Sequence, residues 1–329
     1  MLNIHNGDGT ATTAHQAPIP GAHFAFREAL IGGPAPANLS ESEWRKLRAA
    51  HLSAAYGGSW EDAERDLERQ HAALASFYLH DEVVLWFEHD LFCQLNLIYV
   101  LDWFASRDLG KTKLSLICID SFPGKQNFHG LGELNTTELA SLFDTRHEVT
   151  AREFETATAA WAAYRSPQPT DLETFLQSDT SPMPFLAPAL RSHLARFPST
   201  KNGLGRIEQC GLALVNEGLK KFIELFPRFV QEEPVYGLGD FQLYLALRNL
   251  SYARTPLLRG AHGPKTDMDS TTIKQSAFEI TDKGKAVLKG ESDFIQLNGI
   301  DTWLGGVHLT NKNMWRWDSE QEKILEEGL

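Results

Sequence analysis

Cysteine is scarce in this sequence. Only three of the 329 residues are cysteines, and Cys93, Cys118 and Cys210 lie far apart without a C-x-x-C pair. An odd, dispersed set of this kind supports neither a disulfide framework nor a structural zinc site. The pattern is typical of a protein in a reducing compartment, and we predict a cytoplasmic location.

Targeting and membrane signals are missing as well. The first basic residue is Arg27, so no basic segment followed by an apolar run marks a signal peptide. The most hydrophobic stretch, residues 91–105, contains Gln94, Asn96 and Asp102. It is also shorter than the roughly 20 residues that a helix needs to cross a bilayer. We therefore predict no interaction with a membrane.

Positive charge is in deficit, with 31 basic against 43 acidic residues and a net charge of −12. Such a chain repels phosphate backbones, so nucleic acid is an unlikely partner for the chain as a whole. Residues 1–200 hold 25 acidic and 15 basic side chains, whereas residues 201–289 hold 10 and 13. The small basic excess of that second region favours a solvated basic face over a dedicated DNA-binding surface.

Short aliphatic runs alternate with helical patterns in the first part of the chain. Runs of this length and composition predict β-strands, and the segments between them have apolar residues at helical spacing. Alternation of strand and helix predicts an α/β fold with a mostly parallel, Rossmann-like sheet and flanking helices. The four predicted strands are residues 2–4, 22–26, 82–87 and 113–119.

The chain divides into three predicted regions. Residues 1–145 form an α/β ligand-binding domain, residues 146–200 a helical connector, and residues 201–329 a winged-helix-like C-terminal domain of α+β type. Proline and small polar residues at 197–203 mark the second boundary. Residues 277–288 predict a strand followed by a capped helix, an order that is similar to the end of a winged helix.

Two aromatic segments lie close to the end of the sequence. Residues 303–308 and 314–318 contain tryptophans and predict the two strands of a closing hairpin. Gly305 and Gly306 indicate close backbone packing, so the tryptophans fit a core or an interface better than a base-stacking surface.

Ionisable residues follow each predicted strand. In an open parallel sheet, ligands bind outside the carboxyl ends of the strands, where loops and helix N-termini converge. We therefore expect one crevice lined by these residues. They are His5, Asn6, Gly7 and Asp8 after the first strand, Arg27 and Glu28 after the second, Glu88, His89 and Asp90 after the third, and Asp120 after the fourth.

We assign catalytic roles to Glu88, His89 and Asp90, with Glu88 or His89 as the acid–base group. The predicted ligand-binding residues are His5, Asn6, Gly7, Asp8, Arg27, Glu28, Gln94 and Asp120. The cofactor stays open, with a divalent cation held by the carboxylates as one option. A purely structural alternative is equally compatible with the pattern: Asp8 and Asp90 cap helices, and Glu88 and His89 are solvated.

Short motifs from residues 5–8 to residues 303–309, with a Trp-Phe-Glu-His-Asp-Leu-Phe run at residues 86–92, together resemble DUF1835, a bacterial family of unknown function. The resemblance covers nearly the whole chain, and its most specific part is the Trp-Phe-Glu-His-Asp-Leu-Phe run. Members of the family often have aspartate where this chain has Cys93. The family implies no activity that can be transferred. The segments that carry the resemblance are residues 5–8, 27–34, 84–94, 130–134 and 303–309.

Two functions fit these patterns. The first is an enzyme, a hydrolase or transferase, that binds a small polar or phosphorylated molecule at the carboxyl ends of the predicted strands. Neither G-x-G-x-x-G nor G-x-x-x-x-G-K-[ST] is present, so no common nucleotide motif supports a particular substrate. The second is a metabolite-sensing regulatory protein whose winged-helix-like region contacts DNA or a protein partner.

Overall fold

A five-stranded sheet organises the first half of the chain. In the computed structural model, which describes residues 1–260 and 270–327, the strand order is β2-β1-β4-β5-β6. The first four strands are parallel, and β6 is antiparallel to β5. The fold is therefore mixed α/β with a mostly parallel sheet, as predicted. The strands are β1 (Leu2–Asn6), β2 (Ala22–Phe26), β4 (Glu82–Glu88), β5 (Lys113–Ile119) and β6 (His147–Glu148).

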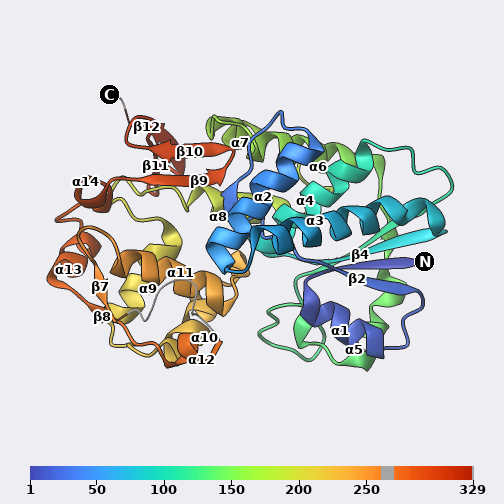
Figure 1. Cartoon of the computed structure of the whole chain (residues 1–329), viewed down its shortest axis with the longest axis horizontal. Coiled ribbons are helices and arrows are strands. Elements are labelled where there is room, and N and C mark those ends of the chain that lie inside the picture. The colour runs from blue at the N-terminus through green and yellow to red at the C-terminus, as the bar shows by residue number, and fades with distance from the viewer. Residues whose placement is uncertain (261–269, 328–329) are drawn as a thin grey trace.

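Both faces of this sheet are buried by helices (Figure 1). On β4, Val83 and Leu85 join the core on one face, whereas Val84 and Trp86 join a second core on the other. Burial on both faces explains why the strand is an uninterrupted apolar run without polar alternation. Helices α1 (Asp8–Gln16) and α5 (Thr136–Ser141) cover one face. Helices α2 (Glu41–Tyr56), α3 (Trp60–Ala75), α4 (Leu91–Ala105) and α6 (Ala151–Tyr164) lie on the other.

The predicted connector is part of this core. Trp161 of α6 and Leu190 of α8 (Leu186–Leu194) are buried in the same cluster as the apolar residues of α4. The hydroxyl of Tyr164, the last residue of α6, donates to the carbonyl of Leu30 at 2.6 Å. Helix α7 (Thr170–Phe175) lies between α6 and α8 in the chain and also packs on α6.

The second half is mainly helical and packs against the first half in one continuous core. Two helices open this half, and Gly218, which adopts a φ of +106°, separates the first from the second. The elements of the second half up to residue 298 are α9 (Arg206–Asn216), α10 (Phe222–Glu232), a 3₁₀ turn η4 (Pro234–Tyr236), α11 (Asp240–Ser251), β7 (Leu258–Arg259), α12 (Ser270–Gln275), β8 (Glu279–Ile280), α13 (Asp282–Leu288) and α14 (Phe294–Asn298).

The two aromatic segments do not pair with each other. Strand β9 (Asp301–Gly305) pairs with β10 (Val307–Thr310), and β11 (Trp315–Asp318) pairs with β12 (Lys323–Glu326). The predicted hairpin between residues 303–308 and 314–318 is therefore wrong, because each segment finds its partner in the residues directly after it. Strand β9 also pairs in parallel with β3 (Gly33–Pro34), near the start of the chain.

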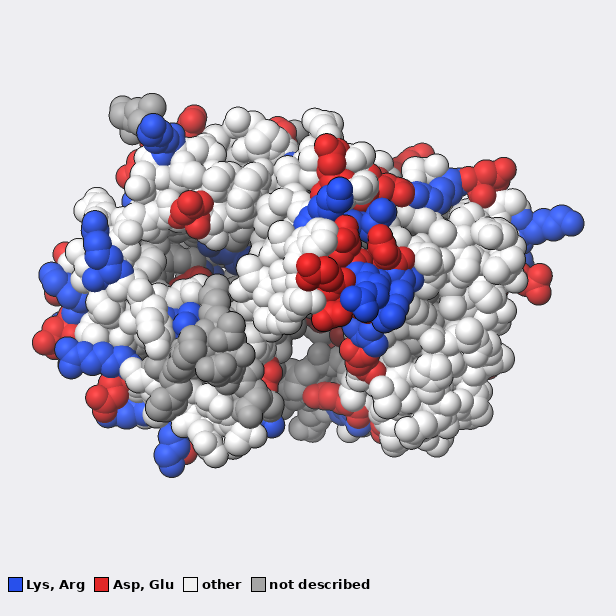
Figure 2. All heavy atoms as spheres, in the orientation of Figure 1, with Lys and Arg blue, Asp and Glu red and all other residues white. Residues whose placement is uncertain are grey.

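The charged surface over α2 and α3 has no single sign. Figure 2 shows acidic and basic side chains mixed over these helices on one face of the molecule. Arg65 pairs with Asp62, and Arg27 pairs with Asp66, at 3.2 Å each. Local pairing of this kind cancels part of the acidic excess on that face. None of the helices within the described ranges is both long and apolar enough to traverse a membrane.

Candidate functional site

The strand order reverses between β1 and β4, since β1 is bonded to β2 on one side and to β4 on the other. Ligands of open parallel sheets bind at such a reversal, outside the carboxyl ends of the strands. A cavity of about 540 Å³ lies there, lined by Asn6 at the end of β1 and by Glu88 at the end of β4. We refer to this cavity as the crevice.

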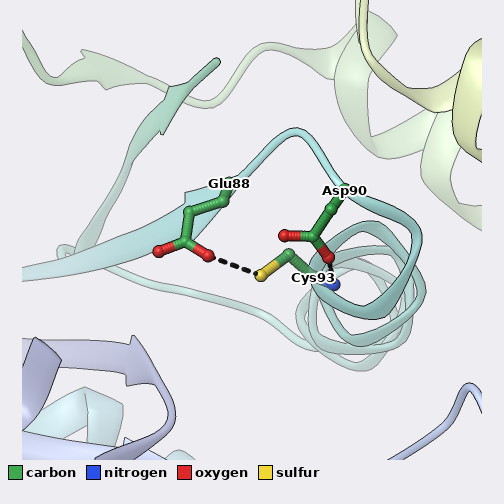
Figure 3. A group of neighbouring side chains, drawn as sticks. All are labelled: Glu88, Asp90 and Cys93. Atoms are coloured by element: carbon green, nitrogen blue, oxygen red, sulfur yellow. Dashed lines mark hydrogen bonds between the residues drawn. The ribbon is translucent and has the colours of Figure 1, made fainter. Parts of the chain in front are cut away.

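Glu88, Asp90 and Cys93 form a cluster on one wall of the crevice. Glu88 ends β4, Asp90 caps α4, and Cys93 lies in the first turn of α4. The Cys93 thiol donates to Oε2 of Glu88 at 3.1 Å, and the Cys93 backbone N–H donates to Oδ1 of Asp90 at 2.9 Å. Figure 3 shows the two carboxylates turned toward each other with the thiol between them.

Further hydrogen bonds fix the position of this cluster. The side-chain amide of Asn6 donates to the sulfur of Cys93 at 2.7 Å. The backbone N–H of Leu131 donates to Oε1 of Glu88 through a short hydrogen bond. Gly130 makes this contact possible, because its φ is +149° and a Cβ at this position would lie 2.8 Å from the Glu88 carboxyl group. Both carboxylate oxygens of Glu88 are therefore held by donors from the protein.

The cluster has two carboxylates, and no lysine or arginine of the described residues forms an ion pair with either of them, although His89 interacts with Asp90 electrostatically. Across residues 1–260 and 270–327, neither Glu88 nor Asp90 makes a salt bridge. Burial, with repulsion from Asp90, raises the pKa of Glu88 to about 7. Burial also raises the pKa of Asp90 and places the pKa of the Cys93 thiol well above its usual value. The cluster therefore retains protons at a pH where exposed carboxyl groups have lost them.

The opposite wall of the crevice comes from the second half of the chain. It is formed by α10 and by the η4 turn with the residues that follow it. Gly237 packs directly on Asp90: its φ is +59°, and a Cβ there would lie 2.1 Å from Oδ1 of Asp90. The contact brings the two halves together at the catalytic candidates. The residues of this wall include Phe226, Phe229, Val230, Glu233 and Leu238.

Three of the predicted ligand-binding residues lie elsewhere. Arg27 donates from Nε to Oδ1 and Oδ2 of Asp8, 2.9 Å away in each case, so each satisfies the charge of the other at the surface. His5 is fully buried on the α1 side of the sheet, and its Nε2 lies 3.0 Å from Nδ1 of His23. Burial lowers the pKa of His5 to about 3, so this imidazole is neutral. The structure does not bring Asp8, Arg27 or His5 into the crevice.

Glu28 and Gly7 have structural roles. Glu28 is buried and accepts from the guanidinium of Arg48 at 2.7 Å, and this arginine is itself fully buried. The Gly7 N–H donates to the carbonyls of His5 and Phe26, so it is not available to a ligand. Gly7, not Asp8, is the N-cap residue of α1.

The remaining predicted site residues, Gln94, His89 and Asp120, do not line the crevice. Gln94 is buried behind it and donates to the Glu88 carbonyl at 2.7 Å, which supports the end of β4. The His89 ring packs against Phe185, with 6.2 Å between ring centroids, and does not line the crevice. Asp120 is exposed, accepts from the hydroxyl of Ser121, and lies outside the crevice. The predicted site therefore contracts to Asn6, Glu88 and Asp90, with Gln94 behind them.

Sequence reasoning did not assign a role to Cys93 or to the residues opposite it. Cys93 comes one helical turn after the Asp90 cap, and this spacing places its thiol beside the end of β4. His129 and Glu133 also line the crevice and come from the glycine-containing loop around Gly130. A loop that passes close to a strand end needs such a glycine. The glycines of this loop were therefore the signal in the sequence that could have placed the loop in the site.

Glu88, Asp90 and Cys93 are also the group within the described ranges that offers ligand atoms for a metal ion, all within 4.8 Å of one another. Two carboxylates and a thiolate are ligands that zinc accepts. In the structure these atoms are instead engaged in hydrogen bonds with N–H and S–H donors. These hydrogen bonds and the raised pKa values suit the cluster to proton transfer.

The comparisons leave the family open. No protein-family model matches the chain, and no curated protein is similar enough to count as a match. The resemblance to DUF1835 stays a prediction. We therefore infer the function from the geometry of the crevice.

Proposed function

We propose that this chain is an enzyme, a hydrolase or transferase, that binds a small polar molecule in the crevice. The observation that carries the proposal is the meeting of Asn6, Glu88 and Asp90 in one cavity at the point where the strand order reverses. This position is the usual binding place of open α/β sheets, and the mostly parallel sheet supports the proposal of a Rossmann-like fold.

The walls of the crevice favour an uncharged or cationic substrate. Among the described residues that line it, four have carboxylates and none is lysine or arginine. Glu233 is paired with Arg206, but the other three carboxylates have no salt-bridge partner among the described residues, so a phosphorylated ligand would meet repulsion beside them. Hydroxyl or amino groups are suitable partners, because carboxylates accept hydrogen bonds from both. We therefore narrow the predicted ligand class to polar molecules without phosphate. The four carboxylates are those of Glu88, Asp90, Glu133 and Glu233.

Glu88 is the acid–base group in this proposal. A pKa of about 7 lets a carboxyl group give and take a proton near neutral pH, which is the condition for general acid–base catalysis. The Cys93 thiol and the Leu131 N–H hold the carboxylate in one orientation. Asp90 faces the same space, and its negative charge favours the protonated form of Glu88. Glu88 donates its proton to the leaving group as the bond to that group breaks. It then takes a proton from the attacking hydroxyl group as the new bond to the substrate forms.

A thermal-shift screen tests the proposal. Wild-type protein is screened against uncharged sugars, nucleosides and amines, and against the phosphorylated forms of the same compounds. A compound that stabilises the wild type should no longer stabilise Glu88→Gln or Asp90→Asn. Asparagine is a good N-cap residue, so the second variant keeps the cap of α4. Asp120→Asn, at a strand end outside the crevice, is the matched control and should respond like the wild type.

Two results would contradict the proposal. One is an unchanged ligand-induced shift in both crevice variants. The other is a preference for phosphorylated compounds that depends on Arg27, since this would place the ligand at the Asp8–Arg27 pair instead.

The regulatory alternative depends on a winged-helix-like arrangement of α9, α10 and α11 with β7 and β8, and α12 lies between these two strands in the chain. In that fold the third helix reads DNA. Here α11 is covered by the first half of the chain: Phe241 packs on Tyr56, and the Tyr56 hydroxyl bonds with Gln242. This cover favours the enzyme. Salt-dependent retention of the full chain on DNA would support the alternative.

A further inference from the structure

A second cavity lies on the far side of the segment that follows η4. It has a volume of about 460 Å³ and is separate from the crevice, although Leu238 lines both. Its walls come from α2, from the glycines around β3, from α11 and from β9. Three parts of the chain that are distant in sequence therefore enclose it, a position typical of small-molecule sites between packed units.

Two opposite charges face this cavity. Arg196 follows α8, and Glu208 lies in the first turn of α9. Burial raises the pKa of Glu208, and the positive charge of Arg196 lowers it, so the two groups interact through space. Within residues 1–260 and 270–327, however, neither side chain has an oppositely charged group within 4.0 Å. The only hydrogen bond of the Arg196 guanidinium in this part of the chain is to Nδ1 of His193, at 3.3 Å.

The wall also contains Asp301 and His51. Asp301 is already paired, because its Oδ1 lies 2.7 Å from Nε2 of His308. Among the arginine, glutamate and aspartate side chains that line the cavity, Arg196 and Glu208 are therefore the two charges left for a ligand within the described residues. An arginine without a carboxylate partner binds a ligand carboxylate well, because its N–H groups match both oxygens. A glutamate on the same wall binds an ammonium group and opposes a purely anionic ligand.

Apolar and aromatic residues form another part of the lining, beside the polar side chains of His51, Gln242, Asn249 and Thr302. Tyr56 and Trp303 contribute rings, and an aliphatic surface lies beside them. The Tyr56 hydroxyl is held by Gln242, so this ring has a fixed position. Such a surface accepts a hydrocarbon or aromatic side chain of a ligand. The aliphatic residues are Ile31, Ala55, Leu238, Leu245, Ala246 and Leu304.

We propose that this second cavity binds a zwitterionic small molecule of the α-amino acid type with an apolar or aromatic side chain. The ligand carboxylate contacts Arg196, its ammonium group contacts Glu208, and its side chain packs among the aliphatic and aromatic residues of the wall. The ligand thereby pairs with two charged groups that have no oppositely charged partner within 4.0 Å among the described residues.

Isothermal titration calorimetry with the full chain tests this site. The probes are L-phenylalanine and L-leucine, each compared with its N-acetyl form, which lacks the ammonium charge, and with its amide, which lacks the carboxylate. We expect at least one of the two amino acids to bind and its single-charge analogues to bind about tenfold or more weakly, as expected for loss of a charged hydrogen bond.

Variants separate the two contacts. Glu208→Gln should remove the preference for the amino acid over its N-acetyl form, and Arg196→Gln should remove the preference over the amide. Circular dichroism and the thermal midpoint show whether each variant is folded. Asp301→Asn, on the same wall, should keep both preferences. Glu88→Gln should also leave binding unchanged, so failure of this site and failure of the crevice are distinguishable.

Three results would overturn the proposal. The first is no heat of binding for either amino acid at millimolar concentration. The second is equal affinity for the amino acid and both analogues. The third is binding that is lost in Glu88→Gln but kept in Arg196→Gln and Glu208→Gln.

Discussion

The raised pKa of Glu88 predicts how the stability of the protein changes with pH. In the unfolded chain the carboxyl group has a pKa of 4.5, and in the crevice the value is about 7. The folded state therefore binds the proton more tightly, and the wild type loses stability as the pH rises through this interval. The two values differ by about 2.5 pH units, and one unit corresponds to about 1.4 kcal/mol, so the loss approaches about 3 kcal/mol.

Glu88→Gln removes this titration and keeps the shape of the side chain. Urea unfolding at several pH values between 4 and 8 gives the free energy of unfolding of both proteins. The wild-type value minus the variant value should fall between pH 4.5 and 7 and be constant above that. Titrating groups that do not interact with Glu88, such as the neutral His5, contribute equally to both proteins and cancel, whereas the coupled Asp90 contributes to the measured difference together with Glu88. Glu68→Gln, an exposed position on α3, is the control and should show no such trend.

A difference between wild type and Glu88→Gln that does not vary with pH would refute this reasoning. It would show that Glu88 titrates alike in the folded and unfolded chain, and that solvent reaches the carboxylate freely. The acid–base role near neutral pH would then lose its physical basis.

Three further predictions follow from buried contacts. Gly237→Ala should lower the thermal midpoint more than Gly218→Ala, because both have a positive φ but only the first alanine would meet Asp90, whereas the second meets open space. Glu28→Gln should cost about 3 kcal/mol or more in urea unfolding, since it leaves a buried arginine without its counter-charge; a cost below about 1 kcal/mol would contradict this. His5 has a lowered pKa, so its contribution to stability is complete above pH 6.5 and is lost as the pH falls toward 3; a His5→Gln variant should therefore lose less stability than the wild type between those pH values, and parallel profiles would contradict the assignment.

Local signals in the sequence predict the elements of the fold well. The strands at residues 22–26 and 113–119 are confirmed at both ends, because short aliphatic runs and the turns beside them are local features. Ser59 and Asn135 are residue types that predict a helix N-cap where acidic residues follow, and hydrogen bonds of their side chains confirm these caps at the starts of α3 and α5. The helix α2 was not predicted, although Ser40 and its capping box mark its start.

Which charged residues pair with each other depends on contacts between distant parts of the chain. For this reason the predicted site included residues that the structure places outside the crevice. Parallel strand ends do place Asn6 and Glu88 at one edge, which sheet topology alone requires. Nothing in the pattern shows that Arg27 turns to Asp8, or that Glu28 is buried with an arginine 20 residues away. Such pairs form only when the helices dock.

The parallel pairing of β3 with β9 has a consequence for synthesis of the chain. Gly33 pairs with Leu304, 271 positions further along, and the N–H of Gly306 donates to the Tyr164 carbonyl at 2.9 Å. At a synthesis rate of about 5–20 residues per second, β9 emerges from the ribosome roughly 15–50 s after β3. The sheet and its helices can assemble meanwhile, but β3 does not have β9 as its partner strand until residue 305 has been made. A nascent chain that stops before β9 exposes this edge, and it is the state of the protein most open to pairing with other chains.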